Sequence, residues 1–166
     1  MRLSAKCLDQ DRRIQSAIRL AAGISVLLMG ASGGWAFAPK PVPQPMENTY
    51  WVYRPTGTGS GVFASGGKQV TLFLDPLKKV AIGSGGCNTF SIPYTLKRGK
   101  ITFGKLTSTD MSCGPVDADE AGYFRLLSGA VKYQIMGNTL SLLGNDGTVT
   151  GTFRSSPLDP GGVPQD

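Results

Sequence analysis

Alternation of apolar and polar residues dominates the chain between residues 50 and 154. Side chains that alternate in this way point to opposite faces of an extended chain, so a period of two predicts β-strands. Two connecting segments, Arg98-Gly99 and Asn145-Asp146-Gly147, have the length and the glycine of β-hairpin turns. The pattern predicts eight strands, over residues 50–54, 69–75, 79–83, 92–97, 100–104, 131–135, 139–143 and 148–154.

One segment has a helical period instead. Apolar residues recur at helical spacing over 117–127, and Ser128-Gly129 is typical of a helix end. Asp117 and Glu120 stand three residues apart, as in a capping box, and we interpret both as helix-start carboxylates. The predicted fold class is α+β with β predominating, a small curved antiparallel sheet or partly open β-barrel with one packed helix.

The two ends of the chain lack these patterns. Residues 1–38 contain five basic residues, then the apolar run 20–31, then Ala36-Phe37-Ala38, which predicts a secretory signal cleaved after Ala38. The alternative is an uncleaved inner-membrane anchor, although the apolar run is shorter than a bilayer normally requires. Residues 39–48 form a Pro-rich linker, 49–154 the folded domain, and 155–166 a flexible tail rich in proline and glycine.

The charge of the chain depends on this processing. The whole chain has 17 basic and 11 acidic residues, a net charge of +6. The signal carries five of the basic and two of the acidic residues, so the mature chain has a net charge of +3. No dense basic cluster with interleaved aromatic residues remains, and we predict no nucleic-acid partner. Lys97, Arg98 and Lys100 form the tightest basic group, which we interpret as a solvated hairpin tip.

The cysteine count agrees with export. Cleavage removes Cys7 and leaves Cys87 and Cys113, and a pair in an oxidising compartment predicts a disulfide. A zinc centre would require three or four ligands, and the sequence has no histidine. A redox motif would place the two cysteines much closer together. We therefore predict a structural bridge, with no metal and no cofactor.

Candidate chemistry is sparse. Without histidine, acid–base catalysis would rest on carboxylates, lysine, tyrosine or thiol groups. The only acidic cluster, Asp117, Asp119 and Glu120, has the helix-start explanation, so no catalytic residue is predicted and the chain is not expected to be an enzyme. Asn88 follows Cys87 in a glycine-rich turn. Its side chain is predicted to satisfy backbone groups of the loop that carries Cys113, with contact to a ligand as the alternative.

Several separated elements together resemble the META domain family, which includes HslJ-like heat-inducible envelope proteins. The resemblance spans about residues 50–153 and is carried by Gly86, Cys87, Asn88, Phe90, Tyr94, Thr109, Met111 and Cys113. Two positions depart from the family pattern. Thr89 stands where members commonly carry arginine, and Ile92-Pro93 stands where they tend to carry a small residue. Pro93 predicts a bulged or edge strand.

The resemblance implies a partly open β-barrel with a packed helix, found in bacterial envelopes, linked loosely to stress tolerance and without established enzymatic activity. Together with the export signal it predicts a non-enzymatic periplasmic module for interaction, assembly or stress tolerance. The expected partner is an envelope protein, without stable membrane insertion after signal cleavage. The alternative is a carrier that holds a small apolar or lipid-like ligand in a cavity of the β-barrel.

Overall fold

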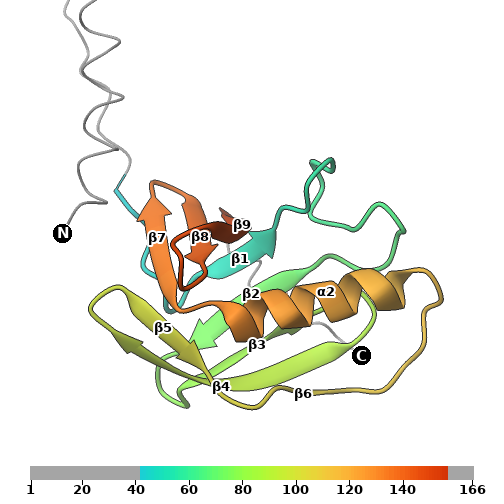
Figure 1. The fold of residues 1–166 in the computed structure, drawn as a ribbon, viewed down its shortest axis with the longest axis horizontal. Helices are drawn as coiled ribbons and strands as arrows, with labels where there is room; N and C mark the ends of the chain where they lie inside the picture. The colour runs from blue at the N-terminus through green and yellow to red at the C-terminus, as the bar shows by residue number, and fades with distance from the viewer. Residues whose placement is uncertain (1–41, 157–166) are drawn as a thin grey trace, which may run out of the picture. The chain divides into compact units, whose positions relative to one another are not determined.

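The computed structural model describes residues 42–156. The predicted export signal, the first residues of the linker and the tail from residue 157 lie outside this range. Within it the chain forms nine strands and one helix (Figure 1). In chain order these are β1 (Tyr50–Tyr53), β2 (Thr71–Asp75), β3 (Val80–Ser84), β4 (Thr89–Lys97), β5 (Lys100–Phe103), β6 (Thr107–Ser108), α2 (Val116–Gly129), β7 (Lys132–Met136), β8 (Thr139–Leu143) and β9 (Val149–Ser156).

The nine strands form one antiparallel sheet, in the order β3-β2-β1-β9-β8-β7-β5-β4-β6. Strand β3 also pairs with β4, so eight strands close into a ring and β6 is appended to β4. Between β5 and β7 the ladder has a single pair in register, Lys100 opposite Lys132. The predicted class, a curved antiparallel sheet with one packed helix, is confirmed.

Alternating side chains of these strands build the core. Along β4, for example, Phe90, Ile92 and Tyr94 are buried, while the residues between them are exposed. This is the period that the sequence pattern indicates. The largest side chains of the strands that are removed from solvent are Trp51, Leu72, Leu74, Ile92, Ile101, Leu140, Leu142 and Phe153.

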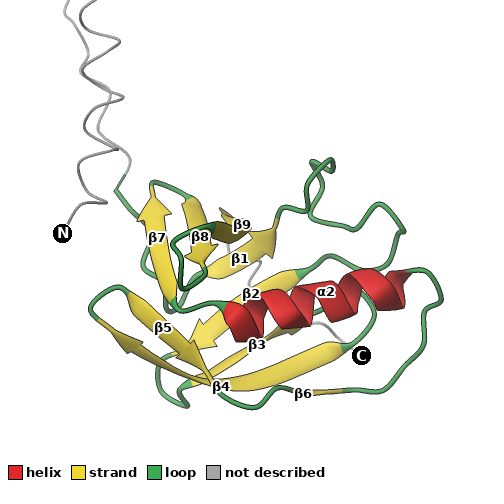
Figure 2. Cartoon of the chain, in the orientation of Figure 1, coloured by secondary structure: helices red, strands yellow, loops and turns green. Residues whose placement is uncertain are grey.

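Helix α2 packs over the strands on one side (Figure 2). The hydroxyl of Tyr123 donates a hydrogen bond of 3.0 Å to the carbonyl of Thr71, at the start of β2. On β9, a Cβ added to Gly151 would lie 2.8 Å from a methyl carbon of Leu126. The helix therefore touches strand backbone directly, and it extends beyond the predicted 117–127 at both ends.

The ordered domain also extends beyond the predicted range of 49–154. Met46 is buried in the core, and its carbonyl accepts a hydrogen bond of 3.0 Å from the indole N–H of Trp51. The amide of Gln44 donates to the carbonyl of Gly137 at 3.0 Å. At the other end, β9 continues to Ser156, in register with β1. The end of the predicted linker and the start of the predicted tail thus belong to the fold.

The prediction for Pro93 is wrong in one part: β4 is not an edge strand, but the ladder on one side of it is interrupted at Pro93, with a register shift of one residue between the pairs Ser91–Thr107 and Tyr94–Phe103. Strand β4 has neighbours on both sides, and its register with β3 runs without a shift to the pair Val80–Pro93. On the other side β4 pairs with β6 up to Ser91 and with β5 from Tyr94 onward. The residue without an N–H therefore sits where β4 changes partner. Strand β6 itself was not predicted, because two residues are too few to show an alternation.

Candidate functional site

The segment that joins β3 to β4 lies against helix α2, and two glycines allow this approach. A Cβ added to Gly85 would lie 2.5 Å from a carboxylate oxygen of Glu120 and 2.7 Å from the ring of Phe124. Gly86 has a φ of 109°, which disfavours any residue with a side chain. The two glycines bring the backbone of the next two residues, Cys87 and Asn88, to the carboxylate of Glu120.

Glu120 is a buried anchor and not a capping residue. Its side chain is 5% exposed, and one carboxylate oxygen accepts from the amide of Cys87 at 3.1 Å and from the amide of Asn88 at 2.6 Å. The other oxygen accepts from the side-chain amide of Asn88 at 2.6 Å. No side-chain hydrogen bond caps α2 at its N-cap residue, Pro115. The predicted capping box is therefore wrong, because three donors on the β3–β4 segment hold this carboxylate instead.

Asn88 joins that anchor to the loop that carries Cys113. Its side-chain oxygen accepts from the amide of Met111 at 2.7 Å and from the hydroxyl of Thr109 at 2.8 Å. Its side-chain nitrogen donates to the carbonyl of Met111 at 3.0 Å as well as to Glu120. Both donor hydrogens and both acceptor positions of the amide are thus used. The predicted structural role of Asn88 is confirmed.

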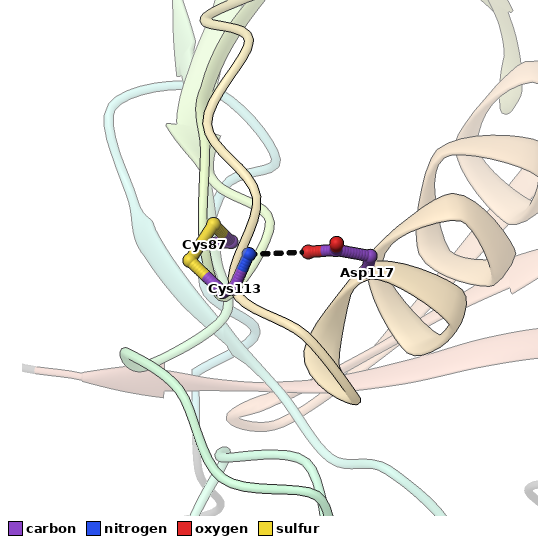
Figure 3. A group of neighbouring side chains, drawn as sticks. All are labelled: Cys87, Cys113 and Asp117. Carbon is purple, nitrogen blue, oxygen red and sulfur yellow. Dashed lines mark hydrogen bonds between the residues drawn. A yellow bond between two sulfur atoms is a disulfide. The ribbon is translucent and has the colours of Figure 1, made fainter.

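The predicted disulfide between Cys87 and Cys113 is also confirmed (Figure 3). Their Cα atoms lie 5.9 Å apart. Next to the bridge, Asp117 accepts from the amide of Cys113 at 2.7 Å and from the hydroxyl of Ser112 at 2.8 Å. The hydrogen bond from the Cys113 amide, followed by that from Ser112, lowers the pKa of the Asp117 carboxyl. Helix α2 thus holds the end of the same loop.

We call residues 109–114 the Asn88 loop. Every residue in it is exposed, including Met111, whose side chain is 50% exposed. The backbone of the loop is nevertheless held at both ends and in the middle, by Thr109 against Thr89, by Met111 against Asn88, and by the disulfide. An exposed segment with this many fixed points can present a constant surface to another molecule.

The same cluster has the composition of a possible metal site. The ligand atoms of Cys87, Cys113 and Asp117 lie within 4.8 Å of one another. Metal binding by cysteine requires the thiolate, however, and the two sulfur atoms are bonded to each other. The Asp117 carboxylate already accepts two hydrogen bonds. The oxidised cluster therefore does not fit a metal ion.

The family model of the META domain matches residues 44–157. The chain belongs to the META domain family. The match begins and ends close to the limits of the ordered domain. It includes the buried Met46, which the sequence pattern assigned to the linker.

Two solved structures are similar to this META domain. The NMR structure of a protein from Burkholderia xenovorans is 28% identical, with a TM-score of 0.54, over 78% of this chain and 99% of that one. A second NMR structure is 22% identical, with a TM-score of 0.48, over 65% of this chain and 89% of that one. No curated protein matches the chain. Among residues 42–156, no helix is long and apolar enough to cross a membrane.

The eight residues on which the resemblance to the META domain family rests lie in different parts of the structure. Six of them meet at the Asn88 loop: Gly86, Cys87, Asn88, Thr109, Met111 and Cys113. Phe90 lies in the core, where its ring is 5.5 Å from that of Phe124 on α2. Thr89, one of the two departures from the family pattern expected from the sequence, is exposed, and its backbone pairs with Thr109. Tyr94 lies farther along β4, away from the other motif residues.

Tyr94 belongs to a second cluster that fastens the N-terminal segment of the META domain. Its hydroxyl donates to a carboxylate oxygen of Glu47 at 2.6 Å, and Lys79 donates to the same oxygen at 2.9 Å. The hydrogen bonds from Tyr94 and then Lys79 lower the pKa of Glu47. Burial, followed by the hydrogen bond to Glu47, raises the pKa of Tyr94. The cluster has a structural explanation, since it ties the chain just before β1 to β4 and to the turn that precedes β3.

Glu47 and the anchoring role of Glu120 were not predicted from the sequence. For Glu120 a signal existed, because Glu120, Tyr123 and Leu127 are spaced three and four residues apart and share the buried face of α2. A carboxylate on the buried face of a helix needs partners in the protein. For Glu47, in a Pro-rich segment, the sequence carries no such signal.

Proposed function

We propose that this META domain is a non-enzymatic binding module of the bacterial envelope, and that the Asn88 loop contacts a partner protein. The proposal is carried by one observation, a loop whose side chains are exposed while its backbone is fixed by Asn88, the disulfide and Asp117. A loop that is ordered before binding loses less conformational entropy when the complex forms.

The residues around the loop support a binding role over catalysis. The sequence contains no histidine. The loop itself contains one exposed carboxylate, Asp110. The two carboxylates of α2 that contact the loop and its anchor, Asp117 and Glu120, accept hydrogen bonds from backbone amides and therefore hold the structure together. Loss of a measured activity on changing one carboxylate, with the fold intact, would support an enzyme instead.

The envelope location rests on the N-terminal segment and on the disulfide, which is compatible with an oxidising compartment. The intact mass of the chain, recovered from the periplasm after expression with its own N-terminus, tests it. We expect a mass that begins at Pro39 and is two hydrogens lighter than the reduced chain. A mass that retains residues 1–38 would favour the membrane-anchor alternative, and two free thiols would contradict the oxidising location.

Site-specific crosslinking in the native host tests the binding role. A photo-crosslinking amino acid is placed at position 111 in one variant and at position 136 in another. The two methionines are matched, because their side chains are 50% and 52% exposed, and Met136 lies on β7, outside the Asn88 loop. We expect a discrete adduct of constant mass from position 111 alone.

A second change tests the link to loop geometry. Asn88→Ala in the position 111 variant removes the hydrogen bonds that fix Met111, while the disulfide remains. The adduct should weaken although the variant is folded. Equal adducts from both positions, or no adduct from position 111 in repeated trials, would contradict the proposal.

We do not extend the proposal to a carrier. The large side chains Trp51, Ile92 and Phe153 are fully removed from solvent and pack together in the core, where a carrier would hold its ligand. A bound apolar molecule that survives purification would reopen that hypothesis.

A further inference from the structure

A row of three lysines crosses the outer face of the sheet. Lys97 on β4 lies directly opposite Lys100 on β5, and Lys100 lies directly opposite Lys132 on β7. Directly opposed residues of antiparallel strands place their side chains on one face, with Cβ atoms about 4.5–5.5 Å apart. Arg98 occupies the hairpin turn beside the row. The sequence pattern showed only the part of this group that lies in the hairpin, because Lys132 joins it from a distant strand.

Within the part of the chain that the structure describes, this group makes no ion pair with an acidic side chain. Across residues 42–156 the ion pairs join Lys78 to Asp75 and Lys79 to Glu47, and none involves the row or Arg98. Like charges directly opposite each other destabilise a sheet. A folded domain that keeps three such lysines in register therefore has an electrostatic cost that an external anion would offset.

An exposed leucine lies at the same end of the sheet. Leu77, in the turn between β2 and β3, is 93% exposed. The turn meets β4 at Tyr94, whose amide donates to the carbonyl of Lys79, and β4 continues for three more residues to Lys97 and the hairpin (Figure 1). An exposed apolar side chain at the same end of a domain as several lysines is a combination that favours the interface of a membrane.

We propose that this end of the domain, formed by the lysine row, Arg98 and Leu77, docks on the surface of bilayers that contain anionic lipids. The row lies on the outer face of a ring of strands, which suits an extended surface. Lysine ammonium groups are hydrated point charges, suited to a diffuse negative surface, whereas bidentate phosphate recognition favours arginine. The neighbouring outward residues, Thr95 and Thr102, offer no aromatic platform for nucleic-acid bases.

This inference does not rest on the proposed role of the Asn88 loop. The loop lies at the start of β4, beside Thr89, and the lysine row at its end, at Lys97. Eight residues of extended strand separate them by roughly 27 Å. The docked domain would keep the Asn88 loop away from the bilayer, so the two surfaces can be tested independently.

Vesicle sedimentation of the chain as recovered from its host tests the proposal. The vesicles contain either phosphatidylcholine alone or equal parts of phosphatidylcholine and phosphatidylglycerol. The test variant carries Lys97→Glu, Lys100→Glu and Lys132→Glu. The control variant carries the same charge change at three exposed basic residues elsewhere, Lys68→Glu, Lys105→Glu and Arg125→Glu.

A basic residue near an anionic membrane contributes about fivefold to binding, so loss of three should lower the partition coefficient at low salt by roughly 100-fold or more. The control variant should change it by less than about fivefold. Leu77→Ser should weaken binding to anionic vesicles by about tenfold, because the apolar tip no longer leaves water. Equal losses in the two triple variants would overturn the proposal, since binding would then follow net charge alone.

Two further measurements distinguish docking on lipid from the alternative explanations. Soluble inorganic polyphosphate is the competing anion, and binding to it with the same variant pattern but without dependence on Leu77 would also overturn the lipid proposal. Lys100→Gln is a variant that we expect to fold. It removes the central like charge, so it should raise the unfolding midpoint while weakening vesicle binding. A variant that is more stable and binds as well as the parent would contradict the proposal.

Discussion

Replacing Asn88 with aspartate changes one atom in the most connected side chain of the site. The side-chain nitrogen, which donates to the carbonyl of Met111 at 3.0 Å and to the carboxylate of Glu120 at 2.6 Å, becomes an oxygen. Both neighbours are acceptors, so two hydrogen bonds become two repulsive contacts. The shape of the side chain is almost unchanged, and the effect is therefore electrostatic.

The expected loss of stability follows from the two donors. A hydrogen bond to a charged group contributes about 1.5–3 kcal/mol, and a buried acceptor left without a donor costs about 1–3 kcal/mol. Asn88→Asp should therefore lower the free energy of unfolding by about 3–5 kcal/mol at neutral pH. A domain of this size has about 5–15 kcal/mol in total, so the loss is a large share of the stability of the domain.

The loss should depend on pH. In the variant two carboxyl groups share a buried site, which raises the pKa of one of them in the folded state above its unfolded value of about 4. A raised pKa means that the folded variant binds a proton that the unfolded chain releases. The stability deficit relative to the parent should therefore be largest at neutral pH and shrink as the pH falls toward 4.

Urea unfolding followed by fluorescence of the buried Trp51 measures both effects. Asn145→Asp is the matched control, because it makes the same chemical change in the exposed turn between β8 and β9. It should change the free energy of unfolding by less than about 0.5 kcal/mol. If Asn88→Asp costs no more than this control, or if its deficit is constant between pH 7 and 4, the hydrogen-bond assignment is refuted.

Three further predictions concern other parts of the domain. Cys87→Ser and Cys113→Ser should each cost about 3–4 kcal/mol, and the double variant should cost no more than either, as chemical denaturation can show. Gly85→Ala should cost about 1–3 kcal/mol by overpacking, whereas Gly129→Ala, with nothing within 4 Å of the added carbon, should be within about 0.5 kcal/mol of the parent. The pKa of Glu47 is lowered by its hydrogen bonds, so its contribution to stability is present above its ordinary pKa of 4.5 and lost below the folded-state value. Glu47→Gln should therefore reduce the dependence of stability on pH in this acidic range, and an unchanged profile would count against the cluster.

Local chemistry explains what the sequence could predict. Each of the eight predicted strands exists, because alternation and turn glycines such as Gly99 and Gly147 act within a few residues. The disulfide followed from counting cysteines, since only one pairing remains after Cys7 is set aside. The structural role of Asn88 could be predicted from its position next to Cys87, because the disulfide places this residue near the loop that carries Cys113.

The features that the sequence did not predict have a different cause. The partners of Glu120 are backbone amides 32 and 33 residues away, and backbone amides have no signature in a sequence. The place of Pro93 depends on where two other strands end along β4. Lys132 meets Lys100 through a single pair that closes the ring. Contacts of this kind are determined by the closed topology and not by any local period.

The pairing of β1 with β9 places the first and the last strand of the domain side by side, with Tyr50 opposite Ser156. Synthesis begins at the N-terminus, so β1 and β8 keep open edges until the last strand has emerged. The ring is therefore completed only after β9 has been synthesised, and strand pairing over such a separation slows folding. The region that forms the Asn88 loop emerges earlier, within residues 83–120. Oxidation of its two cysteines can thus precede closure of the sheet, and the time between the two events is when the chain most needs protection from edge-to-edge aggregation.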